Sequence, residues 1–466
     1  MMHPAENIKK YLRPGVTAHL AGIGGVSMCA LAEMLQGMGV AVQGSDMAES
    51  PAVEHLRSVG IPVAIGHSAE NLGRCDLVIR TAAIHDNNPE IAGAIARGIP
   101  VYERAQALGA IMQGYQNALC IAGTHGKTTT TSMTTQILLD AGIDPTCVIG
   151  GKLPAIHGSG RVGKSPVMVC EACEFVDTFL KLYPDIAVIL NIDADHLDYF
   201  KTMENLIASF RKFAEKATKV LIVNGDDLNT QKAVSGLDKR ILTFGYAPTN
   251  DYYPKNIVHV DGVTLSFDLC RKEEVLTRIT LHIPGDHNIL NAIAACVASH
   301  EAGATWEQCA AGLNAFHGAQ RRFEVLGKIG GITVADDYGH HPTEIEATLK
   351  AAKALPFKRV WAVHQPFTYS RTATLLDDFA RVLSHADFVV LSEIMGSREK
   401  NTYNIYAKDL AAKIPNCVWF PDFPEIADYV VKNARPGDLI LTLGCGDINK
   451  CAHLIVEKLK EKEAKN

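Results

Sequence analysis

The clearest chemical signal in this chain is the run GTHGKTT at residues 123–129, which combines glycines with a lysine and a threonine. Glycines allow backbone N–H groups to approach phosphate oxygens, while Lys127 can reach the outer phosphates and the Thr128 hydroxyl can bind Mg²⁺. The run follows an apolar stretch at 118–122 and leads into a stretch with helical spacing at 130–141. A strand, a glycine turn and a helix N-terminus in this order predict a site for ATP or a close relative.

Acidic side chains and a histidine follow two further apolar stretches. Glu171 comes directly after the stretch 167–170, and the sequence DADHLD, which contains His196, comes after 186–192. Ligands bind beyond the carboxyl ends of parallel strands, so both groups are expected to face the phosphate loop. Glu171 with Thr128 could then bind one Mg²⁺, and His196 a second ion near the γ-phosphate. The alternative is that both are turn residues without a ligand.

Polar residues further along the chain could also contact the nucleotide. Asn288 and Asn291 lie at the start of a predicted helix, and their spacing places both side chains on one helical face. They could bind the nucleotide, or serve only as helix caps. Arg322, in the sequence RRFE, lies at a predicted junction of two segments, where it could reach the γ-phosphate when domains close.

The last part of the chain has three polar turns. The sequence DDYGHHPTE at 336–344 places histidines and acids at a predicted strand-to-helix turn. The sequences HQP and GCGD follow the apolar stretches 360–363 and 439–443. Turns at the carboxyl edge of a parallel sheet are well placed to approach a ligand.

The first part of the chain has a weaker nucleotide signal. The turn GIGGVS at 22–27 follows a predicted strand, and Asp46 ends the next one. A glycine turn followed by an acidic residue is typical of dinucleotide binding, where the acid hydrogen-bonds a ribose. Ser27 occupies the third glycine position, so a nucleotide site and a plain turn between strand and helix both remain open.

The elements that must position these residues form three segments, with boundaries predicted at 1–115, 116–322 and 323–466. In each segment short apolar strands alternate with helices, a pattern typical of α/β domains with parallel sheets covered on both faces. The second segment also contains β-like stretches at 258–269 and 277–283. A charge-rich tail at 458–466 is expected to be a fraying helix end.

Composition narrows the function classes. A chain of 466 residues is too long for one core, and its net charge of −6 provides no basic field for nucleic acid or an anionic membrane. No signal peptide or membrane span is expected. The 12 cysteines are scattered, as in a cytoplasmic protein with reduced thiols, so the C-x-x-C spacing of Cys170 and Cys173 is interpreted as coincidental.

These motifs, in this order, resemble the Mur ligase family over essentially the whole chain. The matching motifs are GIGGVSM at 22–28, GTHGKTTTT at 123–131, EACE at 171–174, DADHLD at 193–198, HNILNA at 287–292, RRFE at 321–324, DDYGHHPTE at 336–344 and GCGD at 444–447. The family shares the short phosphate loop, in which Ile121 stands where the first glycine of the usual pattern belongs. The resemblance implies a Rossmann-like N-terminal domain, a central domain similar to P-loop ATPases and a Rossmann-like C-terminal domain.

The resemblance also implies roles for the matched positions. ATP binding is implied for Gly123, Thr124, His125, Gly126, Lys127, Thr128, Thr129, Asn288, Asn291, Arg322, Asp337 and Tyr338. Binding of Mg²⁺, or of Mn²⁺, is implied for Thr128, Glu171 and His196. Catalytic roles are implied for Lys127, Glu171, His196, Arg322, His340 and Arg371, of which His340 and Arg371 belong with the incoming amino acid and the acyl group. UDP-sugar binding is implied for Gly24, Gly25, Ser45, Asp46, Thr81 and Arg104.

The reaction implied by the resemblance is ATP-dependent ligation of L-alanine to the lactoyl carboxylate of UDP-N-acetylmuramate in peptidoglycan precursor synthesis. It proceeds through an acyl phosphate and yields ADP and phosphate. The chain departs from the family pattern at Ser27, at Cys173, where aspartate is frequent, and at Phe367–Thr368, where the family has His-Arg. The last departure removes a positive charge from the expected amino-acid pocket. A carbamylated lysine is not predicted.

Three other functions remain as alternatives. A sister ligase that reattaches a recovered tripeptide to UDP-N-acetylmuramate would share nearly all these motifs. An NAD-dependent oxidoreductase would use the first glycine turn but leave the phosphate loop unexplained. A non-enzymatic ATP switch would leave the polar turns of the third segment unexplained. A monomer or a homodimer is expected, acting in the cytoplasm on small-molecule substrates.

Overall fold

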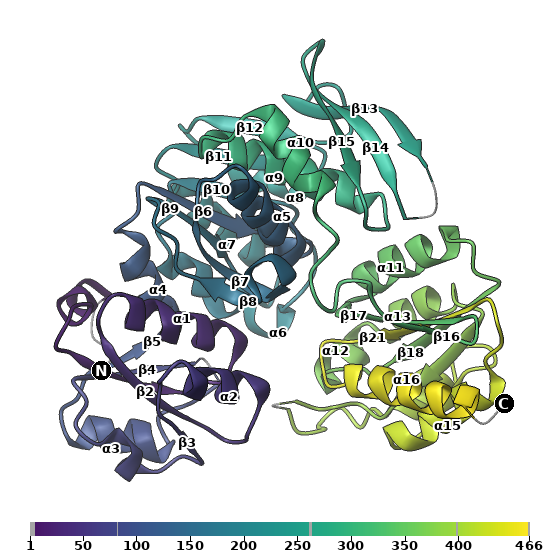
Figure 1. Ribbon diagram of the computed structural model, residues 1–466, viewed down its shortest axis with the longest axis horizontal. Helices are drawn as coiled ribbons and strands as arrows, with labels where there is room; N and C mark the ends of the chain where they lie inside the picture. The colour runs from purple at the N-terminus through teal and green to yellow at the C-terminus, as the bar shows by residue number, and fades with distance from the viewer. Residues whose placement is uncertain (1–4, 82, 261–262, 398, 465–466) are drawn as a thin grey trace. The chain divides into compact units, whose positions relative to one another are not determined.

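The computed structural model describes residues 5–81, 83–260, 263–397 and 399–464. Helices and strands alternate along these residues, and the strands form three sheets (Figure 1). By their contacts, the described residues divide into two units. The first unit runs to Pro254 and includes Leu269–Thr277 and Asn291–Ala315. The second comprises Lys255–Asp268, Arg278–Leu290 and the chain from Phe316 onward. The segment boundaries predicted at 115 and 322 stay predictions.

The first sheet is parallel throughout, in the order β3-β2-β1-β4-β5. Its strands are β1 (Thr17–Ala21), β2 (Ala41–Asp46), β3 (Val63–Ile65), β4 (Leu77–Arg80) and β5 (Val101–Glu103). Helices α1 (Val26–Gly37), α2 (Pro51–Ser58) and α3 (Pro89–Ala96) lie between them, and α4 (Arg104–Met112) follows β5. Because all connections are crossovers, the glycine turn after β1 and the end of β2 lie at the same carboxyl edge.

The second sheet has the order β15-β14-β13-β12-β11-β10-β6-β9-β7-β8. Its strands are β6 (Asn117–Ala122), β7 (Thr146–Leu153), β8 (Gly158–Arg161), β9 (Val167–Glu171), β10 (Ile186–Ile189), β11 (Val220–Asn224), β12 (Ile241–Phe244), β13 (Tyr252–His259), β14 (Leu265–Arg271) and β15 (Glu274–Leu281). Strand β6 pairs in parallel with β9 and β10, so the segments that follow all three strands emerge together. The main helices here are α5 (Lys127–Asp140), α7 (Met203–Glu215), α9 (His287–Glu301) and α10 (Trp306–Asn314).

The hairpin of β7 and β8 joins the first two segments within the first unit. The Ser159 hydroxyl donates to the carbonyl of Val26 at 3.1 Å, at the start of α1. Gly160 lies against Ala30 of the same helix, and Gly37 contacts Val162. The glycines of β8 therefore allow close approach of a strand to α1, which begins at the GIGGVS turn.

The third sheet lies in the second unit and has the order β16-β17-β21-β18-β19-β20. Its strands are β16 (Glu324–Ile329), β17 (Ile332–Asp337), β18 (Arg359–His364), β19 (Phe388–Leu391), β20 (Val418–Trp419) and β21 (Asp438–Leu443). All pairs are parallel except that of the edge strand β16. Helices α15 (Phe423–Asn433) and α16 (Asn449–Ala464) cover one face, and α11 (Pro342–Ala354) and α13 (Leu376–Leu383) the other (Figure 1).

The predicted α/β class with parallel sheets is confirmed, with three local differences. The predicted strand at 186–192 ends at Ile189: the Leu190 N–H still donates to Ala122 of β6, but the Asn191 carbonyl accepts from the Thr124 N–H of the phosphate loop. The β-like stretch at 258–269 belongs to two strands, β13 and β14. The prediction that the tail frays is wrong for the described part of the tail, because α16 continues to Ala464. Leu459 is buried there, and the Lys462 Nζ donates to the Val431 carbonyl at 2.7 Å.

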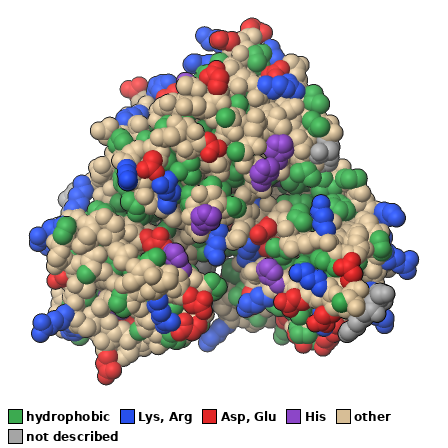
Figure 2. All heavy atoms as spheres, in the orientation of Figure 1, with side chains coloured by type: hydrophobic (Ala, Val, Ile, Leu, Met, Phe, Trp, Pro, Cys, Tyr) green, Lys and Arg blue, Asp and Glu red, His purple; other side chains and the backbone are tan. Residues whose placement is uncertain are grey.

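Among the described residues, no helix combines the length and apolar character needed to cross a bilayer. On the face drawn in Figure 2, basic and acidic side chains are interspersed over the described surface. Such mixing keeps any one sign of charge from dominating that face.

We expect Gly160→Ala to lower the free energy of unfolding by about 1–3 kcal/mol, because the new methyl group would overlap the side chain of Ala30. Denaturant unfolding followed by circular dichroism measures the change. Gly158→Ala in the same strand is the matched control, since its nearest neighbour would be 3.7 Å from the new atom. Equal stability of the two variants would contradict the packing described for this hairpin.

Candidate active site

The phosphate loop between β6 and α5 owes its shape to a glycine and an asparagine. Gly126 has a φ of +83°, and a β-carbon there would lie 2.5 Å from the Asn291 Oδ1. Both the backbone and the space therefore require glycine. The Asn191 side chain accepts from the His125 N–H at 2.8 Å and donates to the His125 carbonyl at 3.1 Å. This two-way bond fixes the loop to the segment after β10.

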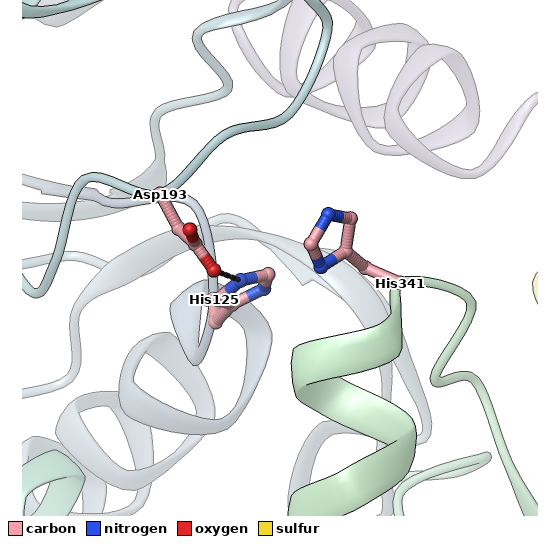
Figure 3. A group of neighbouring side chains, drawn as sticks. All are labelled: His125, Asp193 and His341. Carbon is pink, nitrogen blue, oxygen red and sulfur yellow. Dashed lines mark hydrogen bonds and ion pairs between the residues drawn. The ribbon is translucent and has the colours of Figure 1, made fainter. Parts of the chain in front are cut away.

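Two side chains of the loop bond to the sequence DADHLD. The Thr124 hydroxyl accepts from the Asp193 N–H at 2.9 Å. The His125 Nε2 lies 3.1 Å from the Asp193 Oδ2, as the dashed line in Figure 3 shows. Figure 3 also draws His341, which belongs to the second unit. The polar residues predicted at the ends of β6 and β10 are thus in contact.

Lys127, at the start of α5, turns its ammonium group back toward the loop. Its Nζ donates to the carbonyls of Gly123 at 2.5 Å and Thr124 at 3.0 Å, and to the Glu174 Oε2 at 3.0 Å. Burial alone would lower the pKa of Lys127, but the Glu174 carboxylate and other anionic groups nearby outweigh burial and raise that pKa above its ordinary value. Lys127 therefore carries its positive charge at neutral pH.

Glu171, at the end of β9, lies beside Thr128. Its Oε2 accepts from the Thr128 hydroxyl at 2.8 Å and from the Gly150 N–H of β7 at 2.8 Å. A carboxylate and a hydroxyl at this distance are oxygen donors of the kind that Mg²⁺ prefers. The pair therefore fits a divalent cation, which would replace the hydrogen bond between the two side chains.

His196 reaches the same region through a ring contact. Its ring centroid lies 4.8 Å from that of Phe175, and its Nε2 lies 3.6 Å from the Asp195 Oδ2. The structure thus places His196 against Phe175, in the segment that begins at Glu171. Thr128 and Glu171, in contrast, contact each other directly. A role for His196 as a metal ligand stays a prediction.

Of the two cysteines of the C-x-x-C spacing, Cys170 is buried and Cys173 is half-buried. Burial raises the pKa of Cys170 to about 12 and that of Cys173 to about 11. Both thiols are neutral at physiological pH, whereas metal binding and redox chemistry use the thiolate.

The predicted pair of asparagines serves two different segments. Asn291 lies against Gly126 of the loop. The Asn288 Nδ2 donates to the Pro284 carbonyl at 2.8 Å, and so helps shape the turn before α9. Contact of either residue with a nucleotide stays a prediction.

The first sheet presents its predicted residues at one edge. The Asp46 Oδ2 accepts from the Gly24 N–H at 2.8 Å, which closes the glycine turn against the end of β2. A β-carbon at Gly22 would lie 2.8 Å from the Thr81 Cγ2, so this turn also lies against the segment after β4. Gly25 precedes α1, and Arg104 begins α4. The residues assigned to the UDP-sugar are therefore held near one another, and their role stays a prediction.

Ser45 is the exception, because it is fully buried. Its hydroxyl donates to the Glu90 Oε2 at 2.6 Å and lies 3.0 Å from the His67 Nδ1. Glu90 also accepts from the Asn71 Nδ2 at 2.7 Å, and the His19 Nε2 lies 3.3 Å away. The hydroxyl of Ser45 is thus bonded inside the fold and supports the end of β2.

Glu90 was missed by the sequence analysis, and its setting is unusual for a glutamate. Burial disfavours its charged form, but contacts from His19, Ser45 and Asn71 outweigh burial and lower its pKa to about 2. In the sequence Glu90 is only an acidic residue in the first turn of a predicted helix, where acids are common. No pattern of spacing marks its partners, which come from β1, β2 and the segment after β3.

In the second unit, residues that precede β16 meet residues that follow β17 at an aromatic ring. The guanidinium groups of Arg321 and Arg322 lie 4.9 Å and 5.1 Å from the centroid of Tyr338. The Asp337 Oδ2 accepts from the Phe323 N–H at 2.9 Å. Burial raises the pKa of Asp337 above its ordinary value, although the charge of Arg322 opposes this. The predicted residues Arg322, Asp337 and Tyr338 are thus brought together.

Arg321 was not predicted as a site residue, but it organises this turn. Its Nε donates to the Asp336 Oδ2 at 2.8 Å, and its Nη atoms donate to the carbonyls of Gly444 at 2.7 Å and Gly446 at 3.1 Å. One side chain therefore joins the segment before β16 to the GCGD turn. Its position beside Arg322 was the only signal in the sequence.

The remaining predicted residues lie around the ends of β17, β18 and β21. The His340 Nδ1 lies 3.1 Å from the Tyr338 carbonyl and 3.3 Å from the Glu344 Oε2. Burial raises the pKa of Cys445 in the GCGD turn to about 12, and the charge of Arg371, on α12 (Tyr369–Thr374), opposes this rise. Both therefore belong to the carboxyl edge of the third sheet, as predicted from the turns.

Two buried residues at the end of β18 add to this edge. Burial lowers the pKa of His364 to about 4, so its imidazole is neutral, and its Nδ1 lies 2.9 Å from the Leu443 carbonyl. The Gln365 Nε2 donates to the Asp447 Oδ1 at 3.0 Å. Thr368, at the position where the family has arginine, is buried at the start of α12, and its carbonyl accepts from the Thr372 hydroxyl.

Family models match the chain in three consecutive parts. Residues 17–116 match the model described as Mur ligase family, catalytic domain; residues 121–299 match the Mur ligase middle domain; and residues 321–446 match the Mur ligase, glutamate ligase domain. Together these matches cover most of the chain.

Individual relatives match at similar length. A UDP-N-acetylmuramate–L-alanine ligase from Agathobacter rectalis is 45% identical over 94% of this chain and 97% of its own length. The crystal structure of the UDP-N-acetylmuramate–alanine ligase MurC from Thermotoga maritima has a TM-score of 0.83 at 27% identity, covering 96% of this chain and 99% of that one. A murein peptide ligase from Psychrobacter arcticus has a TM-score of 0.74 at 24% identity, covering 96% and 99%, which shows a shared fold.

We expect Glu90→Gln to lower the free energy of unfolding at pH 7 by about 1–3 kcal/mol, since the amide cannot satisfy the donors around it. The charged form of Glu90 is favoured by folding, so its contribution is present above pH 4.5 and is lost as the pH falls toward 2. The difference between wild type and variant should therefore shrink over that interval. Denaturant unfolding at several pH values measures it, with the exposed Glu54→Gln as control. A difference that persists at low pH would contradict the assignment.

Proposed function

This chain belongs to the Mur ligase family, and from that premise we propose that it joins L-alanine to the lactoyl carboxylate of UDP-N-acetylmuramate in an ATP-dependent reaction of peptidoglycan precursor synthesis. The 45% identity with a UDP-N-acetylmuramate–L-alanine ligase over 94% of the chain supports this substrate pair. The structural observation that carries the proposal is the contact of Thr128 with Glu171 directly beside Lys127. This group provides a cation and two oxygen ligands where a nucleotide's outer phosphates would lie.

The chemistry proceeds in two steps. The lactoyl carboxylate attacks the γ-phosphorus of ATP, and the bond between that phosphorus and the oxygen bridging to the β-phosphorus breaks. ADP departs, and an acyl phosphate remains. The neutral amine of L-alanine then attacks the acyl carbon, and the tetrahedral intermediate expels phosphate, which carries away the proton lost by the amine nitrogen, to give the amide. Lys127 and Arg322 neutralise charge on the transferred phosphoryl group. Thr128 and Glu171, with His196 as a further ligand, would hold a divalent cation, which would supply additional positive charge there.

The other predicted residues take the remaining substrates. The edge of the first sheet, with Gly24, Gly25, Asp46, Thr81 and Arg104, binds the UDP-sugar, and Ser45 supports it from within. Asp337, Tyr338 and the asparagines of α9 contribute to the nucleotide site. His340 and Arg371 serve the amino acid and the acyl group. Mg²⁺ is the proposed metal and Mn²⁺ an alternative.

The reaction belongs in the cytoplasm, where ATP and UDP-sugars are available. The cysteines of the described chain form no disulfides, which suits a reducing compartment. A monomer or homodimer remains our prediction for the active form.

We expect the purified protein to release phosphate from ATP with Mg²⁺ and UDP-N-acetylmuramate only when L-alanine is added. A phosphate-release assay with no acceptor, with L-alanine and with a muramyl-type tripeptide checks this. Preference for the tripeptide would instead identify a ligase that recycles peptides. No release with any acceptor would refute the proposed substrates.

We expect His196→Ala to reduce kcat at least about 100-fold, because a ligand for the divalent cation is lost near the γ-phosphate. The same assay measures kcat, and circular dichroism verifies that the variant is folded. His453→Ala, at an exposed position of α16, is the control and should retain full activity. Near-normal turnover of His196→Ala would remove His196 from the site.

A further inference from the structure

Glu174 forms an ion pair with Lys127 that the proposed reaction does not use. The Glu174 Oε2 lies 3.0 Å and the Oε1 3.3 Å from the Lys127 Nζ. The Glu174 side chain is 1% exposed, and that of Lys127 is 14% exposed. Water screens such a buried pair weakly, so the two charges bind each other strongly.

The contacts of Lys127 leave no donor for a further ligand. An ammonium group has three N–H donors, and those of Lys127 meet three acceptors: the carbonyls of Gly123 and Thr124 and the carboxylate of Glu174. A phosphate oxygen must therefore displace one of them. The carbonyls belong to the loop backbone, so the side chain of Glu174 is the acceptor that can be exchanged.

The charges around the loop explain what such an exchange requires. Two carboxylates, Glu171 and Glu174, lie around the single ammonium of Lys127. ATP without a metal would add several negative charges to this group. A divalent cation at Thr128 and Glu171 would offset part of that repulsion.

We propose that Glu174 is a positioning residue that occupies the outer-phosphate position on Lys127 and is displaced when ATP binds together with its divalent cation. The inference rests on the proposed function, since it takes Lys127 as the ligand of the nucleotide. Glu174 keeps the ammonium group at the mouth of the loop and makes nucleotide binding depend on the metal. Neither the family matches nor the sequence pattern assigns it this role.

The segment that carries Glu174 also contacts the other predicted residues. It begins at Glu171, and Phe175 packs on the ring of His196 at 4.8 Å. Val176 and Asp177 follow with φ values of +54° and +56°, and the Asp177 Oδ2 accepts from the Tyr199 hydroxyl at 2.8 Å. Backbone held in this left-handed region is strained, and anchored contacts maintain it. Displacement of Glu174 would therefore also affect the position of His196.

The first test is ATP binding by calorimetry with Mg²⁺ and with EDTA. We expect Glu174→Gln to bind ATP in EDTA about 5- to 50-fold more tightly than the wild type, because one competing charge is removed. The gain with Mg²⁺ should be smaller. Glu174→Asp, which keeps the charge, should resemble the wild type. Glu301→Gln, which loses a pair with Arg240 in the same unit, is the control and should bind as the wild type does.

The second test needs no nucleotide. We expect Lys127→Met to lower the Tm by several degrees, because it leaves a buried carboxylate without its partner. The double variant Lys127→Met/Glu174→Gln should recover a large part of that loss. Additive effects of the two substitutions would show that the residues do not interact, and would overturn the proposal.

The two tests separate this inference from the proposed function. Absence of ATP binding by the wild type with Mg²⁺ would refute both. Wild-type binding with no gain for Glu174→Gln in EDTA would refute the role of Glu174 alone.

Discussion

The carboxylate of Glu171 is the constraint on which the arrangement of the first unit depends. It accepts hydrogen bonds from Thr128 of the phosphate loop and from Gly150 of β7. The hairpin that begins with β7 packs on α1, whose first turn bonds to Ser159. One acidic side chain therefore stands between the ATP loop and the helix that follows the glycine turn of the first sheet. A metal bound at Glu171 would act on both.

Three buried carboxylates differ in the groups that stabilise their negative charge in place of water. Glu90 is surrounded by hydrogen-bond donors and remains ionised, with a pKa of about 2. Glu174 is paired with a lysine. Asp337 receives backbone N–H groups, yet burial still raises its pKa. The first is part of a rigid framework, the second is exchangeable, and the third lies beside an arginine expected at the γ-phosphate.

The second unit depends on a strained junction. Arg321 and Phe323 have φ values of +59° and +52°, in a region that side chains disfavour. Their cost is offset by bonds of Arg321 to Asp336 and the GCGD turn. The strain orients the chain just before β16, where Arg322 lies against Tyr338. A segment held this way can present Arg322 without a helix or strand of its own.

The sequence by itself determined the α/β class, the strands that carry the polar turns, and the phosphate loop. These follow from local patterns: apolar runs of strand length, glycines and a lysine at a helix start, and acids directly after strands. The family resemblance added the reaction. Glu171 and Thr128 were paired correctly because parallel strands end at one edge.

Only the tertiary structure decided which polar residues are buried and what they contact. Glu90, Glu174 and Arg321 each bond to residues distant in the sequence, and no spacing reveals such partners. The same holds for Ser45, whose hydroxyl faces Glu90 inside the fold. The tail of α16 was misjudged because its charged residues looked solvated, whereas Lys462 reaches a carbonyl of α15. Local sequence specifies elements, but burial and pairing depend on how distant elements pack, and that sets the charge and role of each side chain.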